Sequence, residues 1–253
     1  MKIFNPMRKA NIYLTVFLFI LMNVSISRSE VPKQETIMKE ASYIPFEAKS
    51  GQDKELTAFL KEGATLVAQT EPNTLYWYAL KKNDGSFGIF DFFPNEAGRS
   101  EHFAGKVAAA LNTNADMLVE HGWDKGVVAN ISNFSVLSYK EPDTDLENAT
   151  SATYILLKAQ PGKEQELQQL LIGAASVVAQ TEPKTLLWTS LKLDSNTFGI
   201  FDTFTDESGR EAHFAGKVAA ALKDQADDLV VGGWDNGVLN NIHNFEIIAE
   251  AGK

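Results

Sequence analysis

One sequence of about a hundred residues occurs twice in this 253-residue chain. A shift of 111 residues superimposes the copies without a gap, and Ala64–Leu137 matches Ala175–Ile248 with 44 identical residues at 74 positions. The segment HFAGKVAAAL is shared in full, at His102–Leu111 and at His213–Leu222. A period of this length is too long for a solenoid unit and suits a small domain. The chain is therefore predicted to fold as two equivalent halves.

The N-terminus differs from the repeats. Lys2, Arg8 and Lys9 precede the uncharged apolar run Ile12–Val24, and small residues follow. This is the order of regions in a secretory signal peptide, and the run is shorter than the roughly 20 residues that span a bilayer. We expect residues 1–29 to be a signal peptide and the protein to be exported, with a bacterial periplasm as the compartment. An uncleaved membrane anchor is the alternative.

Composition removes several classes of function. The chain has 33 acidic and 23 basic residues, a net charge of −10, which argues against nucleic acid or an anionic membrane as partner. It has no cysteine, so it has no disulfide and no thiol catalysis. Its four histidines have no metal-ligand spacing, and it has neither a glycine-rich phosphate loop nor a serine nucleophile elbow. We expect no cofactor and no metal.

Each repeat is predicted to be an α+β unit. Hydrophobic periodicity and turn residues indicate the order β-α-β-β-α-β, which is ferredoxin-like. The domains are expected over residues 41–138 and 152–249, with the acidic segment 139–151 as linker. In the first copy, strands are expected at 42–48, 74–81, 87–93 and 131–137, and helices at 53–69 and 96–111. Asn95 and Asp206 suit the N-caps of the second helices.

The predicted hairpin strands are apolar on both faces. Phe87 and Ile89 point to one face, and Phe90 and Phe92 point to the other. The helices cover one face, and the second face needs another cover, because a bare apolar sheet aggregates. We expect the two repeats to cover each other as an intramolecular pseudo-dimer.

Both repeats resemble a known family. The segment TLLWTSLKLDSNTFGIFDTFTDESGREAHFAGKVAAAL is similar to the antibiotic biosynthesis monooxygenases, particularly the small quinol monooxygenases. The matching residues are a strand tryptophan, the Phe-Gly-Ile-Phe-Asp strand, and a Glu-x-Gly-Arg segment followed by histidine and lysine. The resemblance implies a dimeric α+β barrel and oxidation of quinols or polycyclic phenols by O₂ without metal, flavin or haem. The turns Gly122–Gly126 and Gly233–Gly237 depart from the family, which often has a proline-rich turn there.

The same fold includes haem-degrading proteins, whose proximal histidine would lie further along the second helix. The corresponding residues are Ala110–Asn112 and Ala221–Lys223, so that ligand is missing.

A polar stripe runs along each predicted second helix. Arg99, His102 and Lys106 are three and four residues apart and share one face. An imidazole there can take a phenolic proton near neutral pH, and a neighbouring cation can stabilise the anion that results. The alternative is a solvated helix face. The second copy of the stripe consists of Arg210, His213 and Lys217.

Two further residue pairs are candidates for the site. Trp77 and Trp188 lie in mid-strand, either as a wall that stacks a planar substrate or as ordinary core residues. Asp91 and Asp202 lie on an apolar strand face and need a partner, which is either an active-site group or the arginine at the helix start. His121 and His243 have no counterpart in the other repeat, where Gly232 and Ser132 stand, and we interpret them as incidental.

The resulting expectation is a cofactor-free monooxygenase that oxidises a small planar aromatic, such as a quinol, with O₂. His102 and His213 would be the bases and Arg99 and Arg210 the anion stabilisers. The alternative is a non-enzymatic exported module of the same fold that binds a small hydrophobic ligand. Further homo-oligomerisation is compatible with either. The residues expected to bind the substrate are Trp77, Trp188, Lys106, Lys217, Asp91 and Asp202.

Overall fold

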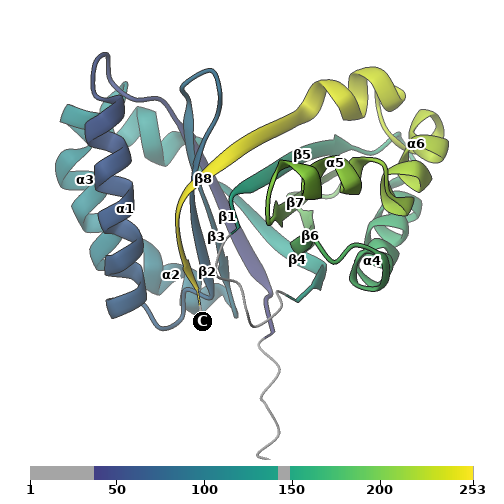
Figure 1. Ribbon diagram of the computed structural model, residues 1–253, viewed down its shortest axis with the longest axis horizontal. Coiled ribbons are helices and arrows are strands. Elements are labelled where there is room, and N and C mark those ends of the chain that lie inside the picture. Colours follow the sequence, from purple (N-terminus) through teal and green to yellow (C-terminus); the bar gives the residue numbers. More distant parts are fainter. Residues whose placement is uncertain (1–36, 142–148, 253) are drawn as a thin grey trace, which may run out of the picture. The chain divides into compact units, whose positions relative to one another are not determined.

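A computed structural model describes residues 37–141 and 149–252, which belong to one compact unit (Figure 1). The predicted signal peptide and most of the predicted linker, residues 142–148, lie outside the described residues. The two ends of that linker belong to strands. The first half consists of β1 (Glu40–Phe46), α1 (Asp53–Thr70), β2 (Tyr76–Lys81), β3 (Phe87–Phe93), α2 (Glu96–Phe103), α3 (Lys106–Leu118), η1 (Gly122–Val127), η2 (Val128–Asn130) and β4 (Ser132–Lys140).

The second half repeats this order, as the internal repeat predicts. It consists of β5 (Ser151–Lys158), α4 (Glu164–Thr181), β6 (Thr185–Lys192), β7 (Thr197–Phe204), α5 (Glu207–Phe214), α6 (Lys217–Leu229), η3 (Gly233–Val238), η4 (Leu239–Asn241) and β8 (Ile242–Gly252).

The eight strands close into one antiparallel barrel in the order β1-β3-β2-β8-β5-β7-β6-β4. Within each half the order is that of a ferredoxin-like sheet, β4-β1-β3-β2 and β8-β5-β7-β6. The halves are joined where the last strand of each pairs with the other half, β8 with β2 and β4 with β6. The predicted intramolecular α+β barrel is therefore confirmed, and the two predicted domains share one sheet.

The barrel interior is a hydrophobic core built by both halves. It contains Tyr43, Phe90 and Phe92 from the first half and Tyr154 and Phe201 from the second. Alternate residues of the same strands face the helices, as the two apolar faces require. Two further cores lie there, one under α1 and α3 and one under α4 and α6, on opposite sides of the strands in Figure 1.

The first helix of each half lies within one residue of its predicted bounds, whereas the second helix of each half differs from the prediction. Asn95 and Asp206 accept hydrogen bonds from the backbone N–H groups of Gly98 and Gly209, which confirms them as N-caps. The expected single helix 96–111 is wrong. It breaks after Phe103, and Gly105 becomes the N-cap of a separate helix that runs to Leu118.

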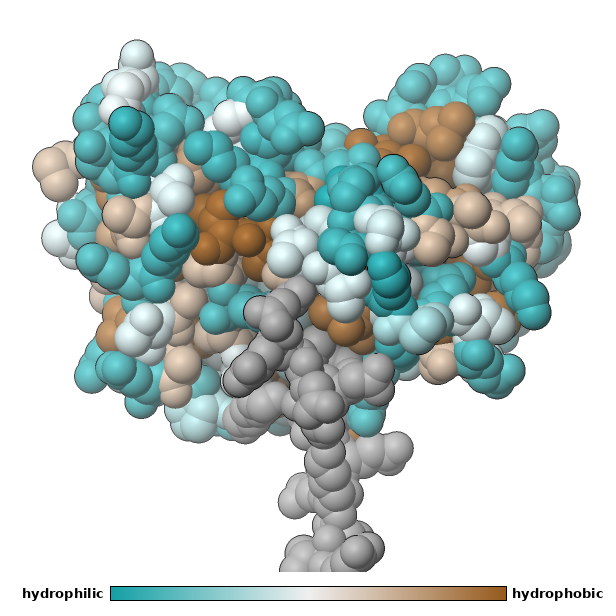
Figure 2. Space-filling model, in the orientation of Figure 1, coloured by the Kyte–Doolittle hydropathy of each residue, from teal (hydrophilic) through white to brown (hydrophobic). Residues whose placement is uncertain are grey.

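The surface is mostly polar. The face in Figure 2 is largely hydrophilic, with hydrophobic colour in small separate areas. Among the described residues, large hydrophobic side chains that are exposed are few and scattered, which fits an interior in which each half covers the other. Of the helices in the described part of the chain, none combines the length and the apolarity that a membrane span needs.

Candidate functional site

Each half buries a histidine between two carboxylates. In the first half, His102 lies near the end of α2, and only 4% of its side chain is exposed. Its Nδ1 lies 2.5 Å from Oε2 of Glu71, which directly follows α1. Its Nε2 lies 3.1 Å from Oδ2 of Asp91, which is fully buried in β3. Three elements that are distant in sequence thus bring a Glu–His–Asp triad together.

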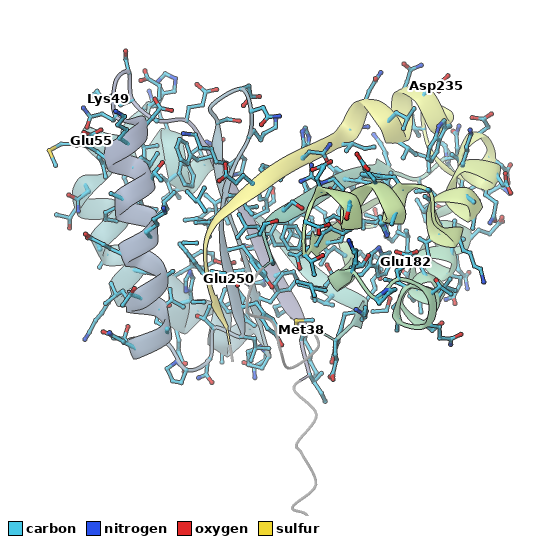
Figure 3. All side chains as sticks on the ribbon, viewed as in Figure 1. Met38, Lys49, Glu55, Glu182, Asp235 and Glu250 are labelled. Carbon is cyan, nitrogen blue, oxygen red and sulfur yellow. The ribbon has the colours of Figure 1, made fainter. Side chains whose placement is uncertain are left out.

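The second half contains the same triad. Nδ1 of His213 lies 2.5 Å from Oε2 of Glu182, which is labelled in Figure 3, and Nε2 lies 3.2 Å from Oδ2 of Asp202. The exposed fraction of each of these three side chains is 8% or less. The geometry of the site is therefore retained in both repeats.

The two carboxylates decide the charge of the imidazole. Burial alone would lower the pKa of His102, but the charge of Asp91 and the hydrogen bonds to Asp91 and Glu71 outweigh it and raise that pKa to about 9. Burial lowers the pKa of His213, but the charge of Asp202 and the hydrogen bond to Glu182, together with the charge of Glu182, outweigh it and raise that pKa. At neutral pH His102 is therefore an imidazolium ion between two carboxylates.

The pKa values of the two buried aspartates are raised, whereas the pKa of a carboxylate in an ordinary ion pair is lowered. Burial raises the pKa of Asp91, against the lowering effect of the His102 charge. Burial raises the pKa of Asp202 to about 7, although His213 and Arg210 both lower it. A carboxyl group that titrates near neutrality is therefore part of the triad.

The break between α2 and α3 belongs to the site. Oε1 of Glu71 accepts a hydrogen bond of 3.2 Å from the backbone N–H of Val107, in the first turn of α3. The carboxylate fills the space beside Gly105, where a Cβ would lie 2.6 Å from Oε1. Glycine is needed there because of this close approach, and the segment that links the helices closes over the triad.

A small cavity of about 140 Å³ opens beside the first triad. It is lined by residues that follow α1 and by the junction of α2 and α3, with Glu71 and His102 in its wall. The cavity has room for one small ring, since a cavity of about 150 Å³ holds benzene.

Comparison with solved structures identifies the fold. A protein from Fusobacterium nucleatum described as a "Putative monooxygenase" aligns with a TM-score of 0.70 at 15% identity, over 86% of this chain and 95% of that chain. One from Lactobacillus acidophilus, also described as a "putative monooxygenase", aligns with a TM-score of 0.69 at 9% identity, over 85% and 96%. A protein of unknown function from Nitrosomonas europaea is 38% identical over 43% of this chain and 98% of its own, with a TM-score of 0.38. No family model and no curated protein matches the chain.

The chain therefore shares the ferredoxin-like α+β barrel fold of the Fusobacterium and Lactobacillus proteins. Identities this low show the fold alone, so the chemistry depends on the residues of this chain. The triad lies between the helices and the sheet, outside the hydrophobic core of the barrel interior.

The predicted polar stripe is divided by the helix break. His102 turns into the triad, whereas Lys106 and its counterpart Lys217 are exposed after the break. Lys106 lines the small cavity. The stripe therefore does not act as one surface, and of its members only His102 and Lys106 reach the cavity of the first half.

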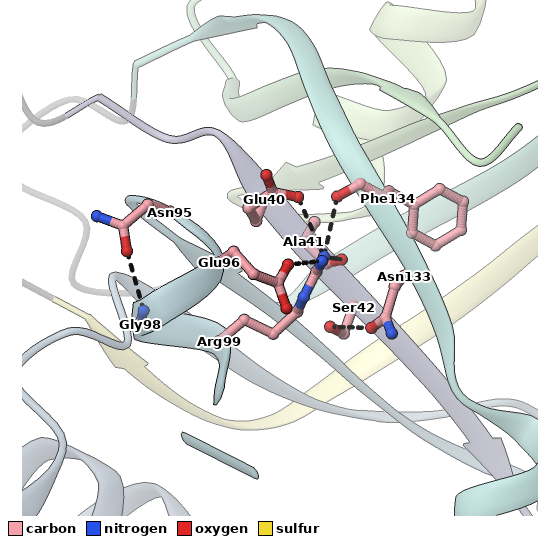
Figure 4. Close-up of polar contacts among 9 residues, drawn as sticks. All are labelled: Glu40, Ala41, Ser42, Asn95, Glu96, Gly98, Arg99, Asn133 and Phe134. Carbon is pink, nitrogen blue, oxygen red and sulfur yellow. Dashed lines mark hydrogen bonds and ion pairs between the residues drawn. The ribbon is translucent and has the colours of Figure 1, made fainter. Parts of the chain in front are cut away.

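Arg99 connects α2 to the sheet (Figure 4). Its guanidinium is paired with Glu96 and Glu40 and donates to the backbone carbonyls of Ala41 and Phe134. In the second half, Arg210 pairs with Glu207 and donates to the carbonyl of Phe245. These contacts give both arginines a structural role, and their role as anion stabilisers stays a prediction.

Trp77 and Trp188 are core residues that border the triads. They lie directly across the β-ladder from Asp91 and Asp202, and their exposed fractions are 1% or less. Within the described part of the chain, the Nε1 atoms of both tryptophans and the Oδ1 atoms of both aspartates are buried without a hydrogen-bond partner. Buried groups of this kind are rare in native proteins and gather where a ligand or an ordered water completes them.

Glu71 and Glu182 are site residues that the sequence did not single out. Each stands in a Glu-Pro pair, which is typical of the end of a helix, and here each glutamate also holds a histidine. The signal was available, because Glu-Pro recurs in both repeats 31 residues before the histidine. The partners of the aspartates were left open, and the structure pairs both with the histidines.

Proposed function

We propose that this protein is a monooxygenase that oxidises a small, single-ring aromatic such as a quinol with O₂ and without a bound cofactor. The observation that carries the proposal is the repeated Glu–His–Asp triad, whose first copy is buried beside a cavity of about 140 Å³. The monooxygenase fold supports the reaction class. The unpartnered Trp77 Nε1 and Asp91 Oδ1 support a ligand in this region.

The triad acts as one proton acceptor. With both carboxylates ionised and the imidazole protonated, its net charge is −1, and one further proton neutralises it. The pKa of Asp202, about 7, brings this uptake close to neutral pH. The substrate hydroxyl gives its proton to the triad, and the imidazolium of His102 or His213 stabilises the phenolate that remains. The histidine thus works inside the triad and not as a free base.

The phenolate then supplies the electrons. It passes one electron to O₂, and the superoxide and the ring radical combine to a ring peroxide. Loss of water from the peroxide leaves the hydroxyquinone, so one oxygen atom stays on the ring and the other leaves as water. Quinol and O₂ together balance hydroxyquinone and water, and no external reductant is needed.

A second candidate is a binding module that holds a small hydrophobic ligand. The barrel interior favours it, because the described residues there form an extensive hydrophobic core. For either candidate we propose export through residues 1–29, from the sequence pattern alone.

Oxygen consumption with a panel of reduced quinols tests the proposal. Uptake is expected to exceed the spontaneous rate, to survive a metal chelator, and to fall at least a hundredfold in the Glu71→Gln/Glu182→Gln double variant. The Gly173→Ala variant is the control, because no atom lies within 4 Å of the Cβ that it adds. Uptake that equals the spontaneous rate would favour the binding module. Uptake that is unchanged in the double variant would exclude the triad as the site.

A further inference from the structure

A large cleft lies away from the triads. It has a volume of about 840 Å³ and is formed by the end of β1, the turn between β2 and β3, the start of η1, and one residue of β8. None of the triad residues lines it. The cleft is therefore separate from the proposed oxygenation site.

Two histidines that break the repeat symmetry meet in this cleft. His121 precedes η1 in the first half, and His243 lies in β8 of the second half. The equivalent positions of the other repeat hold Gly232 and Ser132. His121 has a left-handed backbone with φ of 66°, a conformation that suits the glycine of the other copy better.

The cleft wall is more acidic than the equivalent place in the other repeat. The wall carries four carboxylates against one lysine, whereas the equivalent positions hold one glutamate and one lysine. The residues concerned are Glu47, Asp53, Lys82, Asp84 and Glu120, with counterparts Lys158, Glu164, Leu193, Ser195 and Val231. Only the first of the two equivalent places is strongly acidic.

Two of these carboxylates are available to a ligand. Asp84 pairs with Lys82 at 3.4 Å, and Asp53 pairs with Lys81 at 3.8 Å. In the described part of the chain no ion pair involves Glu47 or Glu120. Their backbones are adjacent, since the N–H of Glu120 donates to the carbonyl of Glu47 at 2.9 Å. Both line the cleft at the same edge.

A tyrosine hydroxyl at the cleft lacks a partner within the described part of the protein. Tyr43 lines the cleft with only 9% of its surface exposed, and no hydrogen bond to its hydroxyl occurs among the described residues. Burial and the charge of Asp84 raise the pKa of this hydroxyl, so it keeps its proton. A hydroxyl that lines a cleft and has no partner within the protein can hydrogen-bond to a ligand there.

Two further aromatic residues line the cleft. Phe46 and Phe87 lie with ring centroids 6.4 Å apart and their planes only 4° from parallel. Faces of aromatic rings attract both apolar rings and cations.

We propose that this cleft binds a small organic cation that carries an apolar ring, such as an arylalkylamine. The ammonium group is held by Glu47 and Glu120 and donates to the Tyr43 hydroxyl, and the ring packs on Phe46 and Phe87. This site is independent of the proposed oxygenation at the triads.

The test uses the whole chain and three probes with the same ring: 2-phenylethylamine as the cation, 2-phenylethanol as the neutral analogue and 3-phenylpropionate as the anion. Binding is followed by titration calorimetry and by the NMR signals of the imidazole protons. The chain has four histidines, so His121→Gly and His243→Ser assign the two signals of interest. The amine is expected to bind one site per chain, at least tenfold more tightly than the other two probes, and to shift the signals of His121 and His243.

Variants locate the binding. Glu47→Lys/Glu120→Val introduces the residues of the second repeat, and Tyr43→Phe removes only the hydroxyl. Each is expected to weaken amine binding, the double variant at least tenfold. Glu55→Lys/Glu62→Val makes the same change of charge on the exposed face of α1 and is expected to have little effect. The proposal is overturned if the amine does not bind at millimolar concentration, binds no better than the carboxylate, or binds the double variant as tightly as the parent chain.

Discussion

Phe90 and Phe201 occupy the same position of the two repeats and stack on each other inside the barrel, with ring centroids 4.0 Å apart and planes 19° from parallel. Each side chain is fully buried. The contact joins a residue to its own repeat counterpart, so it lies at the approximate twofold axis between the halves.

This stack is expected to be a main contributor to stability. Replacing Phe90 or Phe201 with alanine leaves a large cavity in a core that both halves share, so we expect each variant to lower the free energy of unfolding by about 3–5 kcal/mol. Urea unfolding measures the change. Val128→Ala is the control at an exposed position and is expected to change it by less than about 0.5 kcal/mol. A loss below about 1 kcal/mol for Phe90→Ala would show that the interior repacks.

Stability is expected to fall in alkaline solution. The pKa of His102 in the folded chain, about 9, lies above the ordinary value of 6.5, so its stabilising contribution is complete below pH 6.5 and is lost as the pH rises through 9. The shift corresponds to about 3 kcal/mol. His213 shifts in the same direction. Unfolding free energies at pH 6.5 and at about pH 10 measure the loss.

The His102→Gln/His213→Gln variant is the control for this pH dependence. It lacks both imidazoles, so its stability is expected to vary less over the same range. An equally steep fall in the variant would assign the effect to other groups, such as lysines and tyrosines.

A methyl group at Gly105 is expected to disturb the triad. The added Cβ would lie 2.6 Å from Oε1 of Glu71 and 2.9 Å from the carbonyl of His102, so Gly105→Ala must move the carboxylate. We expect a loss of about 1–3 kcal/mol in unfolding free energy and a lower pKa for His102, which NMR titration measures. Gly216→Ala makes the same change in the second half.

Gly173→Ala gives the contrasting result. Gly173 lies inside α4 with open space around it, so alanine is expected to stabilise the chain by about 0.5–1 kcal/mol. A similar effect of the substitutions at Gly105 and Gly173 would contradict the close packing of Glu71 beside the helix break.

Residues 37–141 alone are expected to form a dimer. The separated half would expose the barrel face of Phe90 and Phe92 and leave one edge each of β2 and β4 unpaired, and a second copy supplies the missing neighbours because the repeats are alike. Light scattering after size-exclusion chromatography measures the mass. A folded monomer at micromolar concentration would show that one sheet covers its own interior face.

The fold was predictable from the sequence because its main signals are local or repeated. The apolar residues of 87–93 predicted a strand with two buried faces. The duplicated sequence predicted that the second repeat covers the face that the helices leave open. The helix break at Gly105 was not predictable in this way, because its cause is the approach of Glu71, 34 residues away in sequence. Helical periodicity runs through the break unchanged.

The candidate site was predicted only in part. The histidines and aspartates were found, since a carboxylate on an apolar strand requires a partner. Their pairing and the imidazolium state depend also on Glu71, which directly follows α1. Its position in the sequence indicated only the end of that helix. The cleft with His121 and His243 was missed because its members come from both halves and the repeat alignment marks them as exceptions.

The exchange of β4 and β8 makes a dimer-like barrel within a single polypeptide. A true homodimer dissociates on dilution, and each surface residue must serve identically in two places. Here the tether supplies the second half at a high effective concentration, so dilution does not take the barrel apart. Each half is also free to change alone, so one end of the barrel can acquire a new specificity while the paired triads remain as they were.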